Sequence, residues 1–334
     1  MSVTINDTSE EAKMMRELHG QLVLDEQGFL KKVTQKDPRL NKQVADQYYS
    51  HWSKKETEIK DNDSYVRWGQ SFHFARLYKG DTFEENIKRH EAFLALKLGL
   101  NKGMRVLSSG YAHVTGINNN AYQIQRCFAY AAKYGLEDHT DFVKGDFTRM
   151  PMEDNTFDAV FSVEATVHAP RLEMVYSEIY RVLKPGGRFA CYEWCTTPSY
   201  DETDAVQRRV IHGIEQGNSI SKLYSTAQCL TAAKSVGFKV IEEGDFAPVD
   251  NATEPWYNTL SKPQGVHGIL RSPWGRFYTH SLLTFLSKFG VVPPGVLETS
   301  QLLNDAAEML VAGGKMEIFT PMYFFLVEKP LDAE

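Results

Sequence analysis

Apolar and polar positions along the middle of the chain follow two periods, one typical of helices and one of strands. From Phe83, apolar residues recur three, four and seven positions apart, which predicts a helix ending at Gly99 or Gly103. Beyond it, apolar runs predict strands at 105–107, 114–117, 141–144, 157–163, 188–193, 239–243 and 319–328. Helical periodicity predicts helices at 121–134, 171–183, 204–216 and 225–236, with glycine stops at Gly135 and Gly237. This alternation predicts an α/β fold with a doubly wound, mostly parallel sheet.

The link between the first two predicted strands is unusually short. Only residues 108–113 separate them, whereas a parallel crossover needs about 10–12 residues or more. Two arrangements remain open. In the first, the chain returns and the second strand pairs in parallel with the first, without a helix between them. One face of the sheet would then lack a covering layer, and its apolar side chains would be exposed. Alternatively, the two strands pair as an antiparallel hairpin around 109–111. In both cases the first β-α-β unit is truncated.

The two ends of the chain differ in pattern from its middle. Residues 1–64 are polar, with lysines and acids mixed at helical spacing, which predicts a helical and partly disordered N-terminal extension. Residues 250–315 interrupt the sheet with an aromatic, proline-containing insertion suited to a substrate cap. We therefore expect three parts: the extension 1–64, an α/β core at 65–249, and a C-terminal region at 250–330 that combines the cap insertion with the last strand.

Composition narrows the function classes. With 334 residues, 42% hydrophobic and 24% charged, the chain resembles ordinary globular proteins, and its net charge of −6 does not favour a nucleic-acid partner. The first 21 residues lack the apolar core of a secretory signal, and no apolar run reaches the roughly 18–20 residues of a membrane span. We expect a cytoplasmic protein or one on a membrane surface. The four cysteines lack zinc spacing, so we predict free thiols and no metal site.

Three segments carry a specific resemblance to a known family. They are Gly-Ile-Asn-Asn-Asn-Ala-Tyr-Gln-Ile at 116–124, Phe-Val-Lys-Gly-Asp-Phe at 142–147, and Glu-Ala-Thr-Val-His-Ala-Pro at 164–170. Weaker matches lie at 68–76, 178–187, 192–194, 310–315 and 319–322. Together these segments resemble the sterol 24-C-methyltransferases, which use S-adenosylmethionine in ergosterol and plant sterol synthesis. The resemblance covers about residues 65–330 and implies a class I methyltransferase (Rossmann-like) fold and methyl transfer to C24 of a sterol side-chain alkene.

The chain departs from that family's pattern in two places. Leu107 runs into Ser108-Ser109-Gly110, where the family has Asp-x-Gly-x-Gly-x-Gly-Gly and a helix, and Arg67 replaces the first glycine of Tyr-Gly-Trp-Gly. The first departure removes backbone amides that cradle the methionine end of the cofactor, so we expect weak binding of S-adenosylmethionine or none. Two alternatives follow: an inactive or truncated relative that acts as a sterol-binding or assembly partner, and a methyltransferase for another triterpenoid or secondary metabolite.

The resemblance implies cofactor contacts at the carboxyl ends of the strands. Gly110 belongs to the loop after the first strand, Asn118 and Asn119 occupy the ribose position, Asp146 accepts from the adenine amine, and Phe147 packs beside the ring. Each also has a purely structural interpretation. Asparagine after a strand is a common helix N-cap, and aspartate after glycine is common in turns.

The family's reaction indicates which groups to expect past the central strand. The sterol alkene attacks the sulfonium methyl, a carbocation forms, a hydride shifts and a base removes a proton, which requires aromatic faces and one carboxylate or imidazole. We predict Glu164 as that carboxylate and His168 as a supporting polar contact. Alternatively, Glu164 caps the helix at 171–183 or pairs with an arginine, and His168 is a structural histidine.

Aromatic residues suit a flat apolar ligand with one hydroxyl, although such a cluster is also typical of plain core. The predicted substrate residues are Tyr65, Trp68, Phe72, His73, Phe74, Tyr78, Tyr192 and Trp194. The amphipathic stretch 282–289 fits a membrane surface, a substrate entrance or a buried cap helix. The resemblance also implies a sterol or sterol-like substrate, a homo-oligomer, and a peripheral position on endoplasmic reticulum or lipid droplets.

Overall fold

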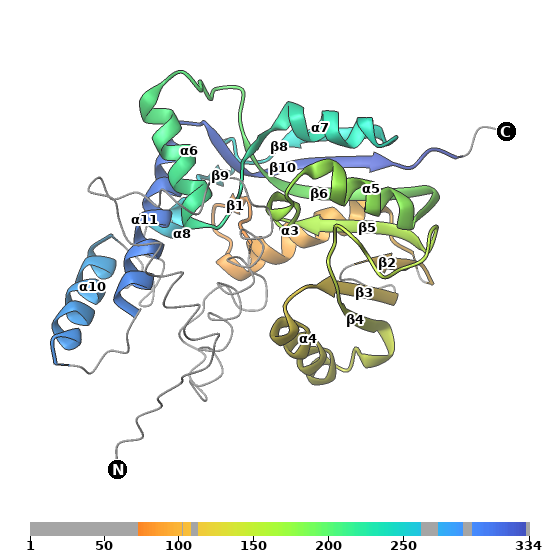
Figure 1. The fold of residues 1–334 in the computed structure, drawn as a ribbon, viewed down its shortest axis with the longest axis horizontal. Coiled ribbons are helices and arrows are strands. Elements are labelled where there is room, and N and C mark those ends of the chain that lie inside the picture. Colours follow the sequence, from red (N-terminus) through yellow and green to blue (C-terminus); the bar gives the residue numbers. More distant parts are fainter. Residues whose placement is uncertain (1–72, 102, 108–112, 262–272, 290–295, 332–334) are drawn as a thin grey trace, which may run out of the picture.

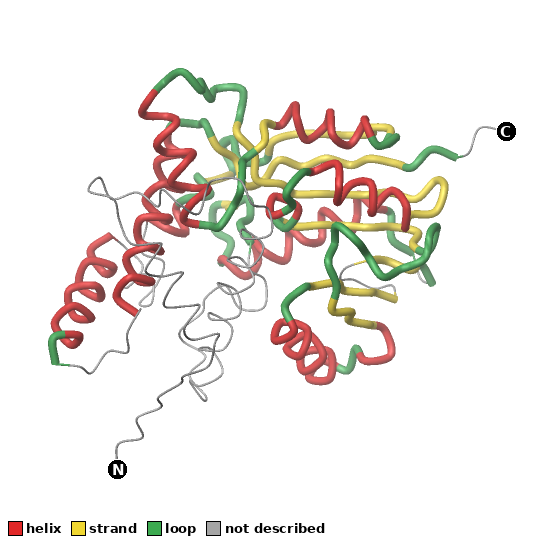
Figure 2. The backbone as a smooth tube through the Cα atoms, in the orientation of Figure 1, coloured by secondary structure: helices red, strands yellow, loops and turns green. Residues whose placement is uncertain are grey.

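One twisted sheet organises the chain (Figures 1 and 2). The computed structural model describes residues 73–101, 103–107, 113–261, 273–289 and 296–331. The sheet order is β4 (Thr140–Lys144), β3 (His113–Asn118), β2 (Arg105–Leu107), β5 (Phe157–Val163), β6 (Leu183–Thr196), β10 (Phe319–Glu328) and β8 (Lys239–Asp245). β10 is antiparallel to both of its neighbours, and the remaining pairs are parallel. The predicted doubly wound, mostly parallel α/β fold is therefore confirmed.

Two short strand pairings complete the described β-structure. β7 (Tyr224–Ser225) extends the sheet beside the carboxyl end of β6. β1 (Leu77–Tyr78) and β9 (Thr253–Glu254) form a separate antiparallel pair that ties the segment after His73 to the start of the C-terminal insertion. Arg76 strengthens this tie, because its Nη2 donates to Asp250 Oδ2 at 2.7 Å.

β2 and β3 pair in parallel, so the hairpin alternative was wrong. Arg105 lies opposite His113, and Leu107 lies opposite Thr115. Because the paired part is only three residues long, the return from Leu107 to His113 spans roughly 8 Å, well within the reach of the residues between them. No crossover helix of ordinary length fits in this link, which confirms the truncated first β-α-β unit.

The apolar residues of these two strands are nevertheless covered, contrary to our expectation. Val106, Leu107 and Val114 are all buried. Helix α3 (Phe83–Leu98) supplies the missing layer, because its Leu94 and Leu98 pack in one cluster with Val106 and Val114. α3, which precedes the sheet in the sequence, therefore covers the sheet face that a crossover helix would otherwise help to cover.

The helix ends follow the local sequence signals. α3 begins with a capping box between Thr82 and Glu85 and ends at Gly99 in the left-handed conformation. α4 (Ala121–Tyr134) packs against β3 and β4 and ends at Gly135, which is also left-handed. These caps pair backbone N–H and C=O groups that have no partner within the helix, and so they define where each helix ends. The predicted helix from Phe83 and the predicted helix at 121–134 are both confirmed.

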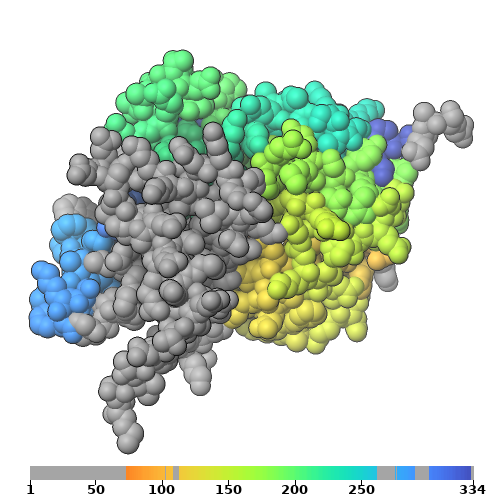
Figure 3. All heavy atoms as spheres, viewed as in Figure 1, coloured from red at the N-terminus to blue at the C-terminus, as the bar shows by residue number. Residues whose placement is uncertain are grey.

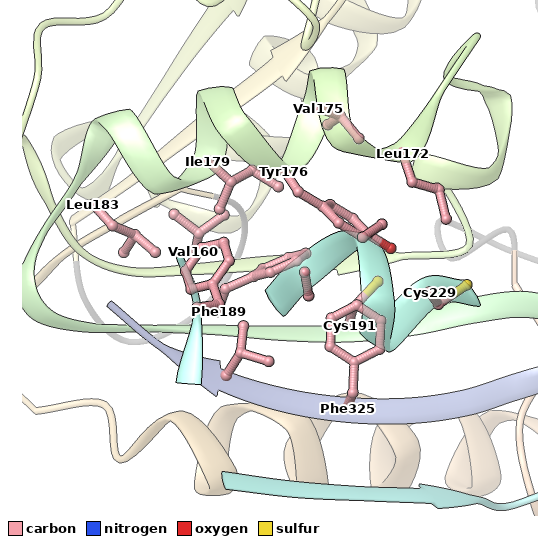
Figure 4. Packing of buried hydrophobic residues seen from close by; sticks show 14 of the residues in the cluster. Val160, Leu172, Val175, Tyr176, Ile179, Leu183, Phe189, Cys191, Cys229 and Phe325 are labelled. Carbon is pink, nitrogen blue, oxygen red and sulfur yellow. The ribbon is translucent and has the colours of Figure 1, made fainter. Parts of the chain in front are cut away.

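The sheet face opposite to α3 is covered by α5 (Leu172–Val182) and α7 (Thr226–Ser235). Figure 4 shows the core beneath them, where Tyr176 of α5 meets Phe189 of β6 and Phe325 of β10. Cys191, Cys195 and Cys229 are buried in the same cluster, and all four cysteines of the chain are free thiols, as predicted.

β6 starts earlier than the sequence indicated. We predicted a strand from 188, after a turn at Lys184-Pro185-Gly186-Gly187, but the strand begins at Leu183. The turn is present as a bulge, because Phe157 pairs with Leu183 whereas Ala159 pairs with Arg188. Gly186 has a φ of 77°, which accommodates the extra residues without side-chain strain.

The C-terminal insertion is mostly helical and shares a core with the sheet. Its helices within the described residues are α8 (Asn258–Ser261), α10 (Pro273–Ser287) and α11 (Val296–Lys315). α11 packs closely on α6 (Ala205–Gly217), where a Cβ at Gly217 would lie 2.5 Å from that of Ala306. Trp256 and Leu310 lie in one buried cluster with Phe74 and Trp194.

The three-part division of the chain stays a prediction, and its first part, 1–64, lies outside the described residues. Two short 3-10 turns complete the elements: η1 (Glu137–His139) and η2 (Thr166–His168). Among the helices in the described ranges, none is long and apolar enough to cross a membrane.

Candidate active site

Glu164 follows the central strand β5 and is held in an unusual backbone conformation. Its φ is 52°, in the left-handed region that a glutamate seldom adopts. Its backbone N–H donates to Tyr192 O at 2.8 Å, and its Oε1 accepts from the backbone N–H of Phe74 at 2.7 Å. The carboxyl group therefore faces the segment 73–76. It does not cap α5, whose N-cap residue is Arg171.

The protonation of Glu164 is strongly perturbed. Although the residue keeps some solvent exposure, its carboxyl group is enclosed by protein, and this burial raises the pKa of Glu164 to about 8. His73, Trp194 and the Phe74 N–H act in the opposite direction and favour the charged form. Glu164 is thus mostly neutral near pH 7 and becomes a carboxylate when a further positive charge approaches.

Two aromatic residues, Phe74 and Trp194, adjoin this carboxyl group and belong to a larger aromatic cluster. Phe74 lies 5.9 Å from Trp194 and 4.9 Å from Trp256, measured between ring centroids, and Trp194 lies 5.3 Å from Phe319. The indole Nε1 of Trp194 is buried and lies close enough to the Glu164 carboxyl group to favour its charged form, although no acceptor in the described part of the chain meets ordinary hydrogen-bond geometry. Trp256 and Phe319 were missed by the sequence reasoning, and the aromatic character of the insertion was the only signal for Trp256.

His73 is placed to carry a positive charge beside Glu164. Its Nδ1 donates to Phe74 O at 2.7 Å, and its Nε2 lies 3.2 Å from Glu91 Oε1. Burial lowers the pKa of His73, but Glu91, Glu164 and the Phe74 carbonyl together raise it above the usual value. Both ring nitrogens can donate at once only in the imidazolium form, which fits this direction.

The Tyr192 ring packs against α3. Its ring stacks on His90 with centroids 3.7 Å apart, and the two residues are buried. Burial lowers the pKa of His90 well below its usual range, so this imidazole is neutral. Tyr78 also contacts α3, because the Arg89 guanidinium of that helix lies 4.7 Å from the centre of its ring.

His168 and Glu193 belong to a second buried polar cluster at η2. Burial lowers the pKa of His168 to about 4, partly offset by the Ser219 backbone, so His168 is neutral at physiological pH. The Glu193 carboxylate accepts from the Thr166 hydroxyl and, at 3.1 Å, from the Val167 N–H. Glu193 therefore fixes the turn that follows Glu164. It lies within the Tyr-Glu-Trp match at 192–194 but was not predicted as a site residue.

The ends of β3 and β4 meet at the same sheet edge. The Gly145 N–H donates to Asn118 O at 3.0 Å, and Asn118 Oδ1 accepts from the Asn120 N–H at 2.8 Å. Asn120 is the N-cap of α4, accepting from the N–H groups of Tyr122 and Gln123. The capping role that the sequence left open thus falls to Asn120, while Asn119 is exposed.

Asp146 takes part in the turn interaction expected as its structural alternative. Its Oδ1 accepts from both the N–H and the hydroxyl of Thr148, at 2.9 and 2.8 Å. Phe147 is half-buried and packs against the core under α5. Their ligand roles stay predictions. Four other predicted site residues lie outside the described residues: Gly110, Tyr65, Trp68 and Phe72.

Comparison with known proteins identifies the family. The family Sterol methyltransferase C-terminal matches residues 267–331, and a Methyltransferase domain family matches residues 96–191. The chain is 39% identical to the sterol 24-C-methyltransferase ERG6 of Saccharomyces cerevisiae, over 97% of this chain and 95% of that protein. It belongs to the sterol 24-C-methyltransferase family. A second family member, cycloartenol-C-24-methyltransferase 1 of Oryza sativa subsp. japonica, is 47% identical over 79% of this chain and 80% of its own length.

Solved structures of S-adenosylmethionine-dependent methyltransferases share the family's fold. The mycolic acid cyclopropane synthase CmaA1, complexed with SAH and CTAB, has a TM-score of 0.62 at 14% identity, covering 86% of this chain and 98% of that one. A geranyl diphosphate methyltransferase in complex with GPP and sinefungin has a TM-score of 0.61 at 14% identity, covering 85% and 99%. These likenesses confirm the class I methyltransferase architecture.

Proposed function

We propose that this chain transfers a methyl group from S-adenosylmethionine to C24 of a sterol side-chain alkene. The observation that carries the proposal is the enclosed Glu164 carboxyl at the end of β5, with Phe74 and Trp194 beside it. Methylation of an alkene produces a carbocation. A buried carboxyl among aromatic faces is suited to stabilise that cation and to accept a proton from it.

The polar residues at the ends of β3 and β4 fit the nucleoside half of the cofactor, which supplies an electrophilic methyl group on a positively charged sulfur. Asn118 and Asn119 would bind the ribose hydroxyls, Asp146 would accept from the adenine amino group, and Phe147 would pack beside the ring. Asn118 uses its amide for Asn120 and Gln123, but a primary amide has two N–H groups and two lone pairs, so it retains capacity for a ligand. We assign no residue to the methionine half.

Glu164 has two tasks in this reaction. In the ligand-free protein its raised pKa keeps it protonated, which avoids a buried unpaired charge. A cation in the site lowers that pKa, so the carboxylate forms when it is needed. It then opposes the positive charge on the sterol and removes the proton that ends the reaction. The neutral His168 supports the turn beside it.

The substrate surface combines the predicted aromatic residues with two more. We assign Phe74, Trp194, Trp256 and Phe319 to the wall around Glu164, because they share one buried cluster. His73 holds the backbone of this wall through its bond to Phe74 O. Roles for Tyr78 and Tyr192 at the outer side of the same pocket, and for Tyr65, Trp68 and Phe72, remain part of the proposal.

The direct test is a methyl-transfer assay. Purified protein is incubated with methyl-labelled S-adenosylmethionine and a sterol carrying a Δ24 double bond, and the product is identified by mass spectrometry. We expect a sterol methylated at C24, formed roughly 10²–10⁴-fold more slowly by Glu164→Gln. Label appearing only on a different triterpenoid would favour the alternative substrate class.

A second candidate function is that of an inactive relative that binds sterol or assembles with a partner. The observation in its favour is the short β2–β3 link. The alignment with the yeast relative spans 365 positions against 334 residues here, so this chain lacks residues that the relative has. Sterol binding without any labelled product in the assay above would support this candidate.

We also propose a peripheral position on endoplasmic reticulum or lipid droplets and a homo-oligomeric state. The support is the family membership together with a lipid substrate. Cell fractionation tests the first, and light scattering on the purified protein tests the second. A protein found only in the cytosolic fraction, or a monodisperse monomer, would exclude the respective proposal.

A further inference from the structure

Helix α10 exposes large apolar side chains on one side. Five residues make up this aromatic stripe: Phe277, Tyr278, Leu282, Phe285 and Phe289, with exposed fractions of 61%, 66%, 57%, 57% and 67%. The last four are spaced by four, three and four positions, which places them along one face of a helix. Phe289 continues the line in the turn just after the helix, where its ring lies 5.0 Å from that of Phe285.

The opposite side of α10 faces the protein. Leu283, Thr284 and Leu286 are half-buried, and α10 packs against α11. His280 lies on this inner side and interacts electrostatically with Asp305 of α11. Figure 1 shows α10 beside α11 at the margin of the molecule, and Figure 3 shows its atoms at the surface there. Of the three alternatives for 282–289, the buried cap helix is therefore wrong, because the side chains of the stripe are exposed.

The charge of this region differs from that of the whole chain. Residues 255–297 contain no aspartate or glutamate, although the chain has 43 acidic residues and a net charge of −6. The same stretch contains Lys262, Arg271, Arg276 and Lys288. Lys288 is exposed and lies directly before Phe289. A cationic segment with an exposed aromatic stripe has the composition that lies in the interface of a bilayer with anionic headgroups.

We infer that the aromatic stripe of α10 docks the protein onto the surface of a membrane that contains anionic lipid. Its rings and Leu282 would enter the headgroup boundary while Lys288 contacts the headgroups. The inference deepens the proposed function, because a sterol substrate is dissolved in membranes. A second copy of the chain is a poorer fit. Five side chains of this exposure offer about 600 Å², whereas a stable dimer buries about 800 Å² on each partner.

Vesicle flotation with the full chain tests this inference. The probes are vesicles of phosphatidylcholine alone and vesicles with about one third phosphatidylserine. We expect binding to the anionic vesicles, weakened at least tenfold by the double change Phe285→Gln and Phe289→Gln. Lys288→Glu should weaken binding to the anionic vesicles and leave binding to neutral ones unchanged. The matched control is Leu96→Gln on α3, a still more exposed apolar residue (79%) outside the stripe, which should bind like the unaltered chain.

The remaining outcomes separate the two proposals. Undiminished vesicle binding by the double variant would overturn the inference, as would a dimer that the double variant converts to monomer. Methyl transfer to detergent-solubilised sterol should be unchanged in the double variant, and transfer to sterol in anionic vesicles should fall in parallel with binding. Vesicle binding that depends on the stripe without any methyl transfer would uphold the docking surface and refute the proposed function.

Discussion

Glu193 shows how a single buried side chain can hold the turn that carries the site. Its carboxylate accepts from the Thr166 hydroxyl and from the Val167 and Trp194 N–H groups, so it joins β6 to η2. Burial raises the pKa of Glu193 to about 7. The pKa of Glu193 is thus close to neutral pH, so protonation of this carboxylate near pH 7 alters its hydrogen bonds to β6 and η2.

Glu193→Ala should destabilise the fold, because it leaves these buried donors without an acceptor. We expect a loss of about 2–4 kcal/mol in the free energy of unfolding, measured by urea denaturation. Glu193→Gln keeps one acceptor oxygen and should lose less than half as much. Equal losses in the two variants would show that side-chain volume, and not the acceptors, matters at this position.

Glu164 should give the reaction a pH dependence. If its carboxylate is the base, kcat/KM in the free enzyme rises with pH and levels off above about 8, the pKa to which burial raises this group. Glu164→Gln should lower the rate by roughly 10²–10⁴-fold and abolish the rise. Initial rates between pH 6 and 9.5 with labelled cofactor provide the measurement. A flat profile in the unaltered chain would assign the base to another group.

For single residues, the sequence allows a prediction of candidate site residues that follow strands. Glu164 was predicted because it comes directly after an apolar strand within a specific motif. Trp256 meets Phe74, and Phe319 meets Trp256, only through tertiary packing, so sequence spacing held no signal for these contacts. The neutral state of His168 likewise depends on burial by residues distant in the sequence.

Among the elements, β10 and α5 are joined by one buried lysine. Lys329 Nζ donates to Tyr180 O and Leu183 O at 2.9 and 2.8 Å, and to Asn155 Oδ1 at 2.7 Å. The two carbonyls lie at the C-terminal end of α5, where the helix dipole favours a positive charge. This one residue thus anchors the end of β10 to the helix layer.

Lys329→Met should cost about 1–3 kcal/mol, because the buried Leu183 carbonyl and two less buried acceptors lose their charged donor. The decrease is measurable as a lower unfolding temperature. Lys239→Met, an exposed lysine on the neighbouring strand β8, should stay within about 0.5 kcal/mol of the unaltered chain. A small effect at Lys329 would mean that water replaces the ammonium group at these carbonyls.

The short β2–β3 link should limit cofactor affinity. We expect S-adenosylmethionine to bind with a dissociation constant weaker than the low micromolar range, because the residues that would cradle its methionine half are missing from this link. Calorimetry on the purified chain measures it, with Asn118→Ala as a test of the nucleoside half. Low-micromolar binding would contradict this expectation.

Element boundaries were predictable wherever a cap or glycine stop defined them. α4 and β10 were predicted with the residue bounds that the structure has. The start of β6 was not predictable, because a bulge hides strand pairing behind turn residues. Pattern alone also could not decide which side of α10 faces the protein, since an outward apolar stripe has the same period as a buried one.

Over the whole molecule, buried titratable groups should shape the dependence of stability on pH. The raised pKa values of Glu164 and Glu193 mean that their contribution is complete below about 4.5 and lost as pH rises through 7 to 8. His90 and His168 have lowered pKa values, so their contribution is complete above about 6.5 and lost as pH falls. Below pH 6.5, the contributions of the carboxyl groups and of the histidines to stability change in opposite directions.

The unfolding temperature should therefore fall between about pH 6.5 and 8, where the contributions of the two carboxyl groups and of His73, whose pKa is also raised, decrease. Differential scanning fluorimetry across this range is the measurement. The double variant Glu164→Gln and Glu193→Gln should show a flatter profile over the same interval. A profile that rises with pH in the unaltered chain would mean that these carboxyl groups are ionised in the folded state.

The overall architecture followed from the alternation of strands and helices, but the join between the insertion and the core did not. Periodicity placed residues 250–315 outside the sheet. It gave no sign that Trp256 and Leu310 would complete a core with Phe74 and Trp194. Such long-range contacts depend on shape complementarity, which no local pattern encodes.

The position of β10 has a consequence for how the protein is made. β10 lies between β6 and β8, yet it is synthesised after both of them and after the helical insertion. While a nascent chain is still on the ribosome, β6 and β8 therefore each present an open edge that another chain can pair with. If synthesis ended before Phe319, the released product would have both strand edges open. Such a product would depend on chaperones to avoid aggregation.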